Sequence, residues 1–80
     1  MKIKSLKANQ TQITLPNGTI VFVSYETPVA AFIVGKGIIR TSKKWSVTTT
    51  KHINAWIREE FSPYVSVEEV EQRELDTILS

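Results

Sequence analysis

About half-way along the 80 residues, the spacing of the apolar residues changes from one typical of strands to one typical of helices. This change constrains the fold more than any other feature of the sequence. Residues 1–50 are rich in Val, Ile and Thr and have only Leu6 and Leu15 as leucines, which is typical of strands. Beyond residue 46 the apolar residues recur at helical spacing. Because 80 residues hold a single core, we expect one α+β domain.

Five short strands are predicted in the first half, separated by turn signals. Pro16-Asn17-Gly18 is the strongest signal, because Asn-Gly tolerates the positive φ of a tight hairpin turn. Weaker signals lie at 8–10, 26–28 and 35–37. Since all connections are short, the strands are expected to form an antiparallel meander. The expected strands are 2–7, 12–15, 19–25, 29–34 and 38–42.

Two helices are predicted in the second half. Ser46 or Thr48 can cap the first helix, which ends at the segment 61–64. The residues that share its apolar face are Thr49, Ile53, Trp56 and Ile57. Ser66-Val67-Glu68-Glu69 matches a capping box and predicts a second helix toward Leu79. This helix is weaker, because glutamates interrupt its apolar stripe.

Charge is divided unevenly along the chain. Residues 1–66 hold nine basic and three acidic residues, whereas residues 67–80 hold five acidic residues against Arg73. A basic body attracts polyanions. We expect residues 1–64 to form the domain and residues 65–80 to form an acidic helix or tail that folding does not require.

The predicted strands 19–25 and 29–34 are apolar on both faces, where a sheet with one wet face would alternate with polar residues. One helix covers only one face of such a sheet. Self-association through the other face, most simply as a two-fold dimer, is therefore expected. The alternative is a sheet that curls and closes on itself.

Polar side chains gather where the last predicted strand leads into the first helix. A helix N-terminus attracts anions, threonines and lysines add donors and charge, and Trp45 offers a surface on which a base can stack. The combination predicts a site for a phosphate-bearing ligand, without the Gly-rich loop of the common nucleotide-binding motifs. The predicted binding residues, including two at the end of the third strand, are Tyr25, Thr27, Lys43, Lys44, Trp45, Thr48, Thr49, Lys51 and His52.

Each of these residues also has a structural interpretation, which the sequence leaves open. Ser46 and Thr48 can serve only as helix caps. Lys43 and Lys44 can form a solvated turn, and Trp45 can lie in the core with Trp56. His52 can be a surface residue, and Tyr25 and Thr27 can do no more than shape the turn before Pro28.

Catalysis, metal binding and cofactors are not expected. The chain has no cysteine and a single histidine, which excludes thiolate or His-rich metal sites and a cysteine nucleophile. A Ser24–His52–Glu26 triad can be written, but Ser24 and Glu26 lie on the same side of one strand and would not flank His52. The sequence shows neither a signal peptide nor the roughly 20 apolar residues of a membrane helix. We therefore expect a cytoplasmic protein.

The segments VSYETPVAA at 23–31 and KWSVTTTKHIN at 44–54 resemble a family of small proteins with a domain of unknown function. The resemblance covers roughly residues 10–58. It implies a context among phages, plasmids and prokaryotic genomes, where small accessory proteins often bind nucleic acid or a host component. It assigns no roles to its motif positions, which are Tyr25, Thr27, Trp45, Ser46, Thr48, Thr49 and His52.

The expected function is that of a small non-enzymatic binding protein of phage type. Its ligand would carry phosphate, for example a nucleotide signal that is sequestered as a counter-defence measure in the host cytoplasm. One alternative is an accessory protein that binds DNA or RNA through the basic body. A second alternative is an inhibitor that binds a host protein.

Overall fold

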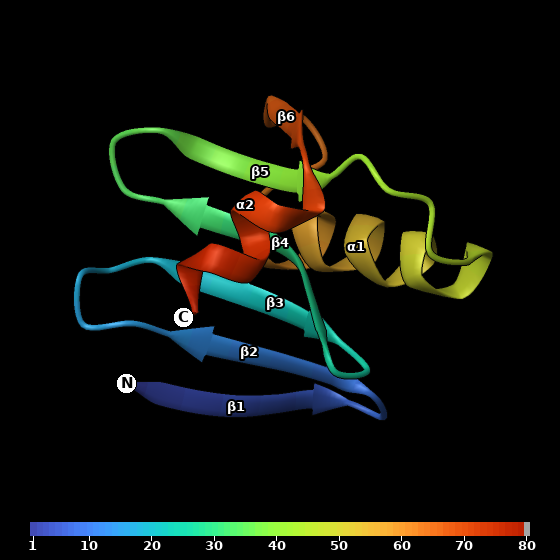
Figure 1. Ribbon diagram of the computed structural model, residues 1–80, viewed down its shortest axis with the longest axis horizontal. Coiled ribbons are helices and arrows are strands. Elements are labelled where there is room, and N and C mark those ends of the chain that lie inside the picture. The colour runs from blue at the N-terminus through green and yellow to red at the C-terminus, as the bar shows by residue number, and fades with distance from the viewer. Residues whose placement is uncertain (80) are drawn as a thin grey trace.

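The computed structural model describes residues 1–79 and shows an α+β fold, with a six-stranded sheet and one helix on each of its faces (Figure 1). The strands lie across the sheet in chain order. Neither helix of this part of the chain is long and apolar enough to cross a membrane. The elements are β1 (Lys2–Lys7), β2 (Gln10–Thr14), β3 (Ile20–Ser24), β4 (Thr27–Ile33), β5 (Gly37–Thr41), α1 (Val47–Glu60), β6 (Val67–Val70) and α2 (Gln72–Ile78).

Strands β1 to β5 form the predicted antiparallel meander. The turn between β2 and β3 forms where the Asn-Gly signal predicts it. The Gly18 N–H donates to the Leu15 carbonyl at 3.0 Å, and the Thr19 N–H donates to Asn17 Oδ1 at 3.0 Å. Gly18 has a φ of +91°, and a Cβ there would lie 3.0 Å from Val34 Cγ2. The positive φ therefore favours glycine at this position, and a Cβ would also push the exposed Val34 side chain aside by a few tenths of an ångström.

The β3–β4 connection is tighter than the sequence predicts. Only Tyr25 and Glu26 separate the strands, and β4 begins at Thr27 rather than at Val29. Pro28 fits within β4 because the ladder is bulged there: Phe22 pairs with Ala30 but Val23 pairs with Pro28, so Val29 is the extra residue. As a result Val29 and Ala30 both join the core cluster under α1.

The first helix follows the prediction closely. Ser46 is its N-cap, and its buried residues are the four predicted ones, Thr49, Ile53, Trp56 and Ile57. They pack on the side chains of β3, β4 and β5 that face α1, among them Phe22 and Ile38. The helix ends at the C-cap Phe61, whose N–H donates to the Ile57 carbonyl.

The Ser46 cap gives a first testable prediction. Ser46 Oγ accepts from the Thr49 N–H at 3.0 Å and lies 3.2 Å from Thr49 Oγ1. Ser46→Ala removes both interactions and is expected to lower the free energy of unfolding by about 1 kcal/mol. Ser66→Ala is the matched control, because Ser66 is exposed and precedes a strand. In urea denaturation, equal effects of the two substitutions would contradict the assigned cap.

The C-terminal segment differs most from the prediction. The expected helix from Ser66 to Leu79 is instead β6, which pairs in parallel with β5, followed by the seven-residue α2. The expected five-stranded antiparallel sheet is therefore a six-stranded mixed one. Val70 and Leu75 are 7% and 0% exposed and pack with Val21, Ala31 and Ile39. From β6 to Ile78 this segment pairs with β5 or packs on the sheet, while Ser80 lies outside the described residues.

The second apolar face of the sheet thus has a cover within the same chain. Helix α2 lies against β4 and β5 on the face opposite α1 (Figure 1). The argument from two apolar faces to a dimer no longer holds for these strands. Ile3 of β1 remains 68% exposed, and self-association stays a prediction.

Candidate functional site

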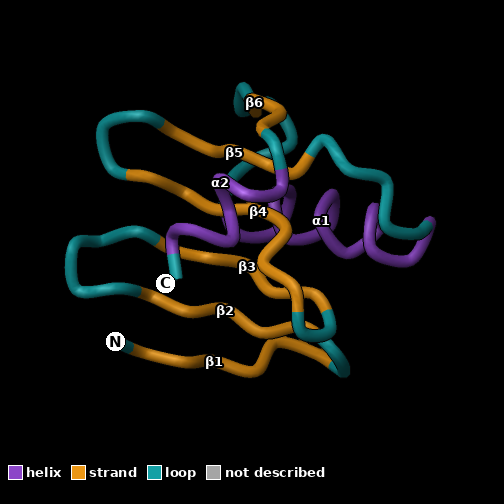
Figure 2. Tube along the Cα trace, viewed as in Figure 1, coloured by secondary structure: helices purple, strands orange, loops and turns teal. Residues whose placement is uncertain are grey.

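The predicted site lies where the loop 42–46 carries the chain from the end of β5 to the start of α1 (Figure 2). One hollow of about 370 Å³ opens here. Its lining residues are Lys44, Ser46, Val47, Thr50 and Lys51. Of the two threonines predicted at the start of α1, Thr48 is exposed but lies outside this lining, and Thr49 is buried beneath the cap.

Electrostatics at this hollow favour an anion. The first turn of α1 contains no acidic side chain, so the partial positive charge of the helix N-terminus is not neutralised within its own helix. No carboxylate belongs to the lining, whereas two lysines do. Ser46 accepts from the Thr49 N–H with its Oγ and from the Thr50 N–H with its carbonyl, so Val47 and Thr48 carry the backbone donors left for water or a ligand.

Trp45 follows Lys44 in the chain, but it neither lines this hollow nor lies in the core. Its side chain is 42% exposed, and Lys43 Nζ lies 4.0 Å from the centre of its ring. The Trp45 Nε1–H donates to Gln72 Oε1 at 3.0 Å. The Gln72 amide in turn donates to the Pro28 carbonyl at 2.7 Å and to Asp76 Oδ1 at 2.9 Å. The interpretation of Trp45 as a core residue under α1 is therefore wrong, and Gln72 is a neighbour that the sequence analysis missed.

Tyr25 and Thr27 line a separate hollow, at the β3–β4 turn. Its volume is about 420 Å³, and Asn9 and Glu26 complete its lining. Tyr25 has a φ of 58°, which is rare for a residue other than glycine. The Tyr25 N–H donates to the Asn9 carbonyl at 2.7 Å, a bond that ties together the β1–β2 and β3–β4 turns.

His52 connects this turn to α1. Its ring stacks on that of Tyr25 at a centroid distance of 6.1 Å, and its Nδ1 lies 3.0 Å from Ser24 Oγ. Ser24 is only 2% exposed, so a substrate has no open approach to its hydroxyl. Among residues 1–79 Glu26 makes no hydrogen bond or ion pair with His52. We interpret the Ser24–His52 contact as an anchor for the ring and not as part of a triad.

The structure thus divides the predicted site in two. Lys44 and Lys51 meet in the hollow at the start of α1, whereas Tyr25 and Thr27 line the other one. Lys43 and Trp45 contact each other but line neither hollow.

Residues 1–76 match a family of unknown function, DUF8033. The chain belongs to this family. The match is wider than the resemblance to residues 10–58, and it takes in β6 and most of α2, in agreement with the packing of these elements. No curated protein and no solved structure shows a significant match to the chain.

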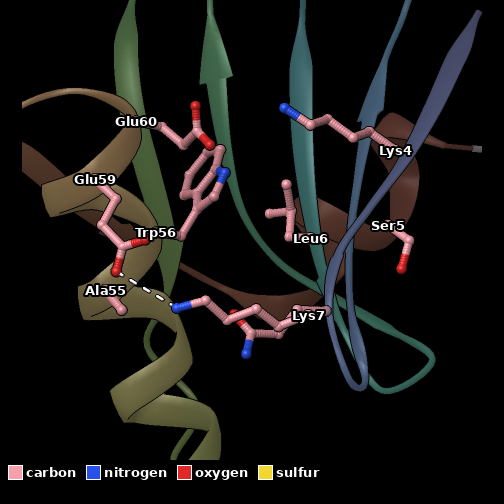
Figure 3. Close-up of a pocket in the computed structure, with 9 residues that line it drawn as sticks. Lys4, Ser5, Leu6, Lys7, Ala55, Trp56, Glu59 and Glu60 are labelled. Atoms are coloured by element: carbon pink, nitrogen blue, oxygen red, sulfur yellow. Dashed lines mark ion pairs between the residues drawn. The ribbon is translucent and has the colours of Figure 1, made fainter.

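The DUF8033 chain carries further basic side chains on the α1 side of its sheet. Lys4 pairs with Gln12, whose Oε1 accepts from Trp56 of α1, so Lys2 and Lys4 share the α1 side of the sheet. Figure 3 shows Lys4 and Lys7 across a groove of about 230 Å³ from Glu59 and Glu60. The groove is thus mixed in charge, and the sequence analysis did not single it out.

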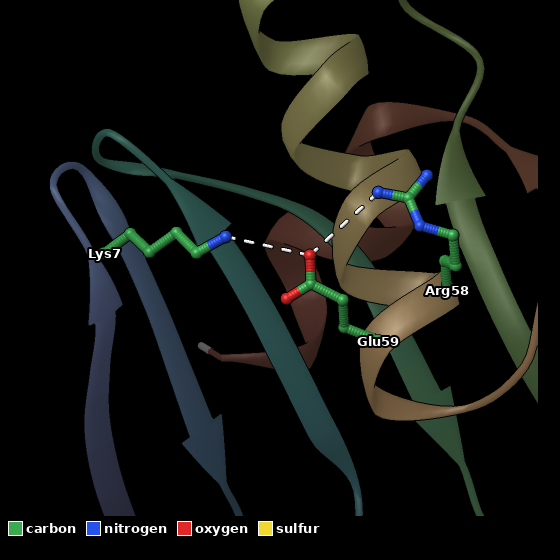
Figure 4. A network of polar contacts seen from close by, with 3 residues as sticks. All are labelled: Lys7, Arg58 and Glu59. Atoms are coloured by element: carbon green, nitrogen blue, oxygen red, sulfur yellow. Dashed lines mark ion pairs between the residues drawn. The ribbon is translucent and has the colours of Figure 1, made fainter.

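Glu59 lies between two cations at this groove. Its Oε2 is 3.7 Å from Lys7 Nζ and 4.0 Å from Arg58 Nη2, as Figure 4 shows. All three side chains are more than half exposed, and exposed pairs of this kind stabilise a fold by at most about 1 kcal/mol. The contacts therefore leave both Lys7 and Arg58 accessible to an anionic ligand.

Proposed function

We propose that this DUF8033 protein is a non-enzymatic binding protein that takes a phosphate-bearing ligand, such as a nucleotide, at the start of α1. One observation carries the proposal. Lys44 and Lys51 line the same hollow as two hydroxyl groups, at a helix N-terminus whose first turn has no acidic residue. Charged donors and unpaired backbone N–H groups together favour phosphate. Trp45 keeps exposed surface nearby on which a base can stack.

The proposal predicts which lysines matter. Lys44→Ala or Lys51→Ala is expected to weaken nucleotide binding about tenfold or more, because each removes a charge-assisted contact. Lys2→Ala and Lys4→Ala are the matched controls, since both residues are exposed lysines on β1, away from the hollow. Titration calorimetry against a panel of cyclic and linear nucleotides measures the effect. If no nucleotide of the panel binds, the proposed nucleotide site at the start of α1 is wrong.

A second candidate, nucleic-acid binding, is favoured by the position of the β1 lysines. They share the α1 side of the sheet with Lys51 and Arg58, so basic side chains are spread over this side of the molecule, with Glu59 and Glu60 among them. A short DNA duplex and a matching RNA would then bind with a steep dependence on salt. The loss of affinity would be shared among all lysines of this side instead of being confined to Lys44 and Lys51.

The biological setting rests on the motif resemblance described above. It implies a phage or plasmid context, and within that context we propose a counter-defence role in the host cytoplasm. If neither a nucleotide nor a nucleic acid binds, inhibition of a host protein becomes the leading candidate. Pull-down from host lysate with the full chain tests that outcome.

A further inference from the structure

A third hollow, of about 270 Å³, lies between α1, β5 and the chain that leads into β6. Two arginines and an asparagine, Arg40, Asn54 and Arg58, supply its polar lining. The rest of the lining is apolar: Ile57, Pro63, Val65 and Val67. The hollow shares no lining residue with the site at the start of α1. Arg58 follows Lys51 by seven residues, or about 10 Å along the helix.

Arg40 has an unsatisfied donor here. Its Nη1 donates to Asn54 Oδ1 at 2.7 Å, but its Nε is buried and has no hydrogen-bond partner. Buried donors of this kind are rare in folded proteins, since an unmet donor is costly. Among residues 1–79, Arg40 forms no ion pair, although Glu69 stands beside it in the β5–β6 register. The guanidinium is thus held in place without an acceptor for its Nε–H.

Arg58 adds a second guanidinium at the same hollow. Its side chain is 59% exposed, and its one ion pair, to Glu59, is long at 4.0 Å. A guanidinium presents a planar set of donors that matches a carboxylate or a phosphate in two-point contacts. The apolar side chains of the lining provide no acceptor, but they can pack against the non-polar part of a ligand.

We propose that this hollow binds an organic anion, a carboxylate or a phosphate monoester, with its charge on Arg40 and Arg58 and its apolar part on Ile57, Val65 and Val67. The anion binds the part of the Arg40 guanidinium that lines the hollow, next to the buried Nε–H. Asn54 fixes the plane of the Arg40 guanidinium by holding Nη1. The proposal is independent of the nucleotide site, because it uses neither Lys44 nor Lys51.

Nuclear magnetic resonance of the arginine side chains tests the proposal directly. The chain has three arginines, Arg40, Arg58 and Arg73, so their Nε–H signals can be assigned by substitution. Phenyl phosphate and benzoate serve as probes, with phenol and inorganic phosphate as comparators. We expect the two organic anions to shift the Arg40 Nε–H signal in a saturable way. Phenol is expected to leave it unchanged, and inorganic phosphate to bind at least about tenfold more weakly.

Substitutions locate the binding. Arg40→Lys keeps the charge but loses the planar donors, and Arg58→Gln removes the second cation; each is expected to weaken probe binding about tenfold. Arg58→Gln keeps the test valid if Arg40→Lys fails to fold, because Arg58 is exposed. Arg73→Gln is the matched control, since Arg73 is an exposed arginine on α2 that pairs with Glu71. Lys51→Ala must also leave probe binding unchanged, which separates this site from the nucleotide site.

Three results would overturn the proposal. The Arg40 Nε–H signal could stay unchanged at saturating probe, which would mean that the anion does not bind beside this guanidinium. Phenol could bind as well as benzoate, which would remove the role of the anion. Arg73→Gln could weaken binding as much as Arg58→Gln, which would mean that the probes respond to the net charge of the protein and not to this hollow.

Discussion

A chain that ends at Tyr64 is expected to lose its cooperative unfolding transition. The deletion removes β6 from the edge of the sheet and uncovers the face on which α2 packs, including Val21, Ala31 and Ile39. Leu75 is fully buried in this cluster, and Leu75→Ala alone is expected to lower the free energy of unfolding by about 2–5 kcal/mol. That is a large share of the roughly 5–15 kcal/mol that stabilises a typical domain. Thermal denaturation followed by circular dichroism measures both changes.

Leu79→Ala is the matched control for Leu75→Ala. It makes the same change near the same helix, but Leu79 is 37% exposed and belongs to neither core cluster. We expect it to change the free energy of unfolding by less than about 1 kcal/mol. If the truncated chain melts like the full chain, the acidic segment is dispensable after all and the packing of α2 on the sheet is wrong.

Local sequence signals account for the elements that this chain forms from neighbouring residues. Asn17-Gly18 predicts its turn because the positive φ lies at Gly18 itself, within the motif. Ser46 and the buried face of α1 are predicted because helical spacing is local as well. The meander follows, since short turns leave its strands few other partners.

The C-terminal segment was mispredicted because its pattern fits two structures. Val67 and Val70 are three residues apart, which suits a helix, and Glu68-Glu69 completes the apparent capping box. The same four residues form β6 because β5 offers a free edge, on which Val67 pairs with Ile38 and Val70 with Thr41. That pairing bridges nearly thirty residues of chain and depends on α1 to return the chain to the sheet. No local sequence signal predicts the pairing of β6 with β5.

In the candidate sites too, groupings of residues that are close in sequence could be predicted, whereas contacts between distant parts of the sequence could not. Lys44, Ser46 and Lys51 are close in sequence, and they do line one hollow. The contacts that place the other side chains join separate elements: Trp45 with Gln72, Ser24 with His52, and Arg40 with Asn54. Residue types alone cannot predict these pairs, because each depends on how a helix lies on the sheet.

Trp56→Ala is expected to be among the most destabilising single substitutions on the α1 side of the sheet, at about 3–5 kcal/mol. Trp56 is 3% exposed and stacks on Phe22 at a centroid distance of 5.1 Å, with Phe61 edge-on at 5.2 Å. Its Nε1–H donates to Gln12 Oε1 at 2.9 Å, which links α1 to β2. The substitution therefore removes a ring contact on two sides and a hydrogen bond at once. Urea denaturation followed by circular dichroism measures the loss.

Two further variants separate these contributions. Trp56→Phe keeps an aromatic ring between Phe22 and Phe61 but loses the hydrogen bond to Gln12. Because Gln12 is half-buried and can bind water instead, losing this bond is expected to lower the free energy of unfolding by about 1 kcal/mol, in addition to the effect of the smaller ring. Trp45→Ala removes the same side chain from a position that is 42% exposed, and it should cost less than about 1 kcal/mol. The protein without Trp45 also has Trp56 as its only tryptophan, whose fluorescence should shift to longer wavelength on unfolding. Equal destabilisation by Trp45→Ala and Trp56→Ala would contradict the assignment of Trp56 to the core and of Trp45 to the surface, because only a buried ring leaves a cavity behind.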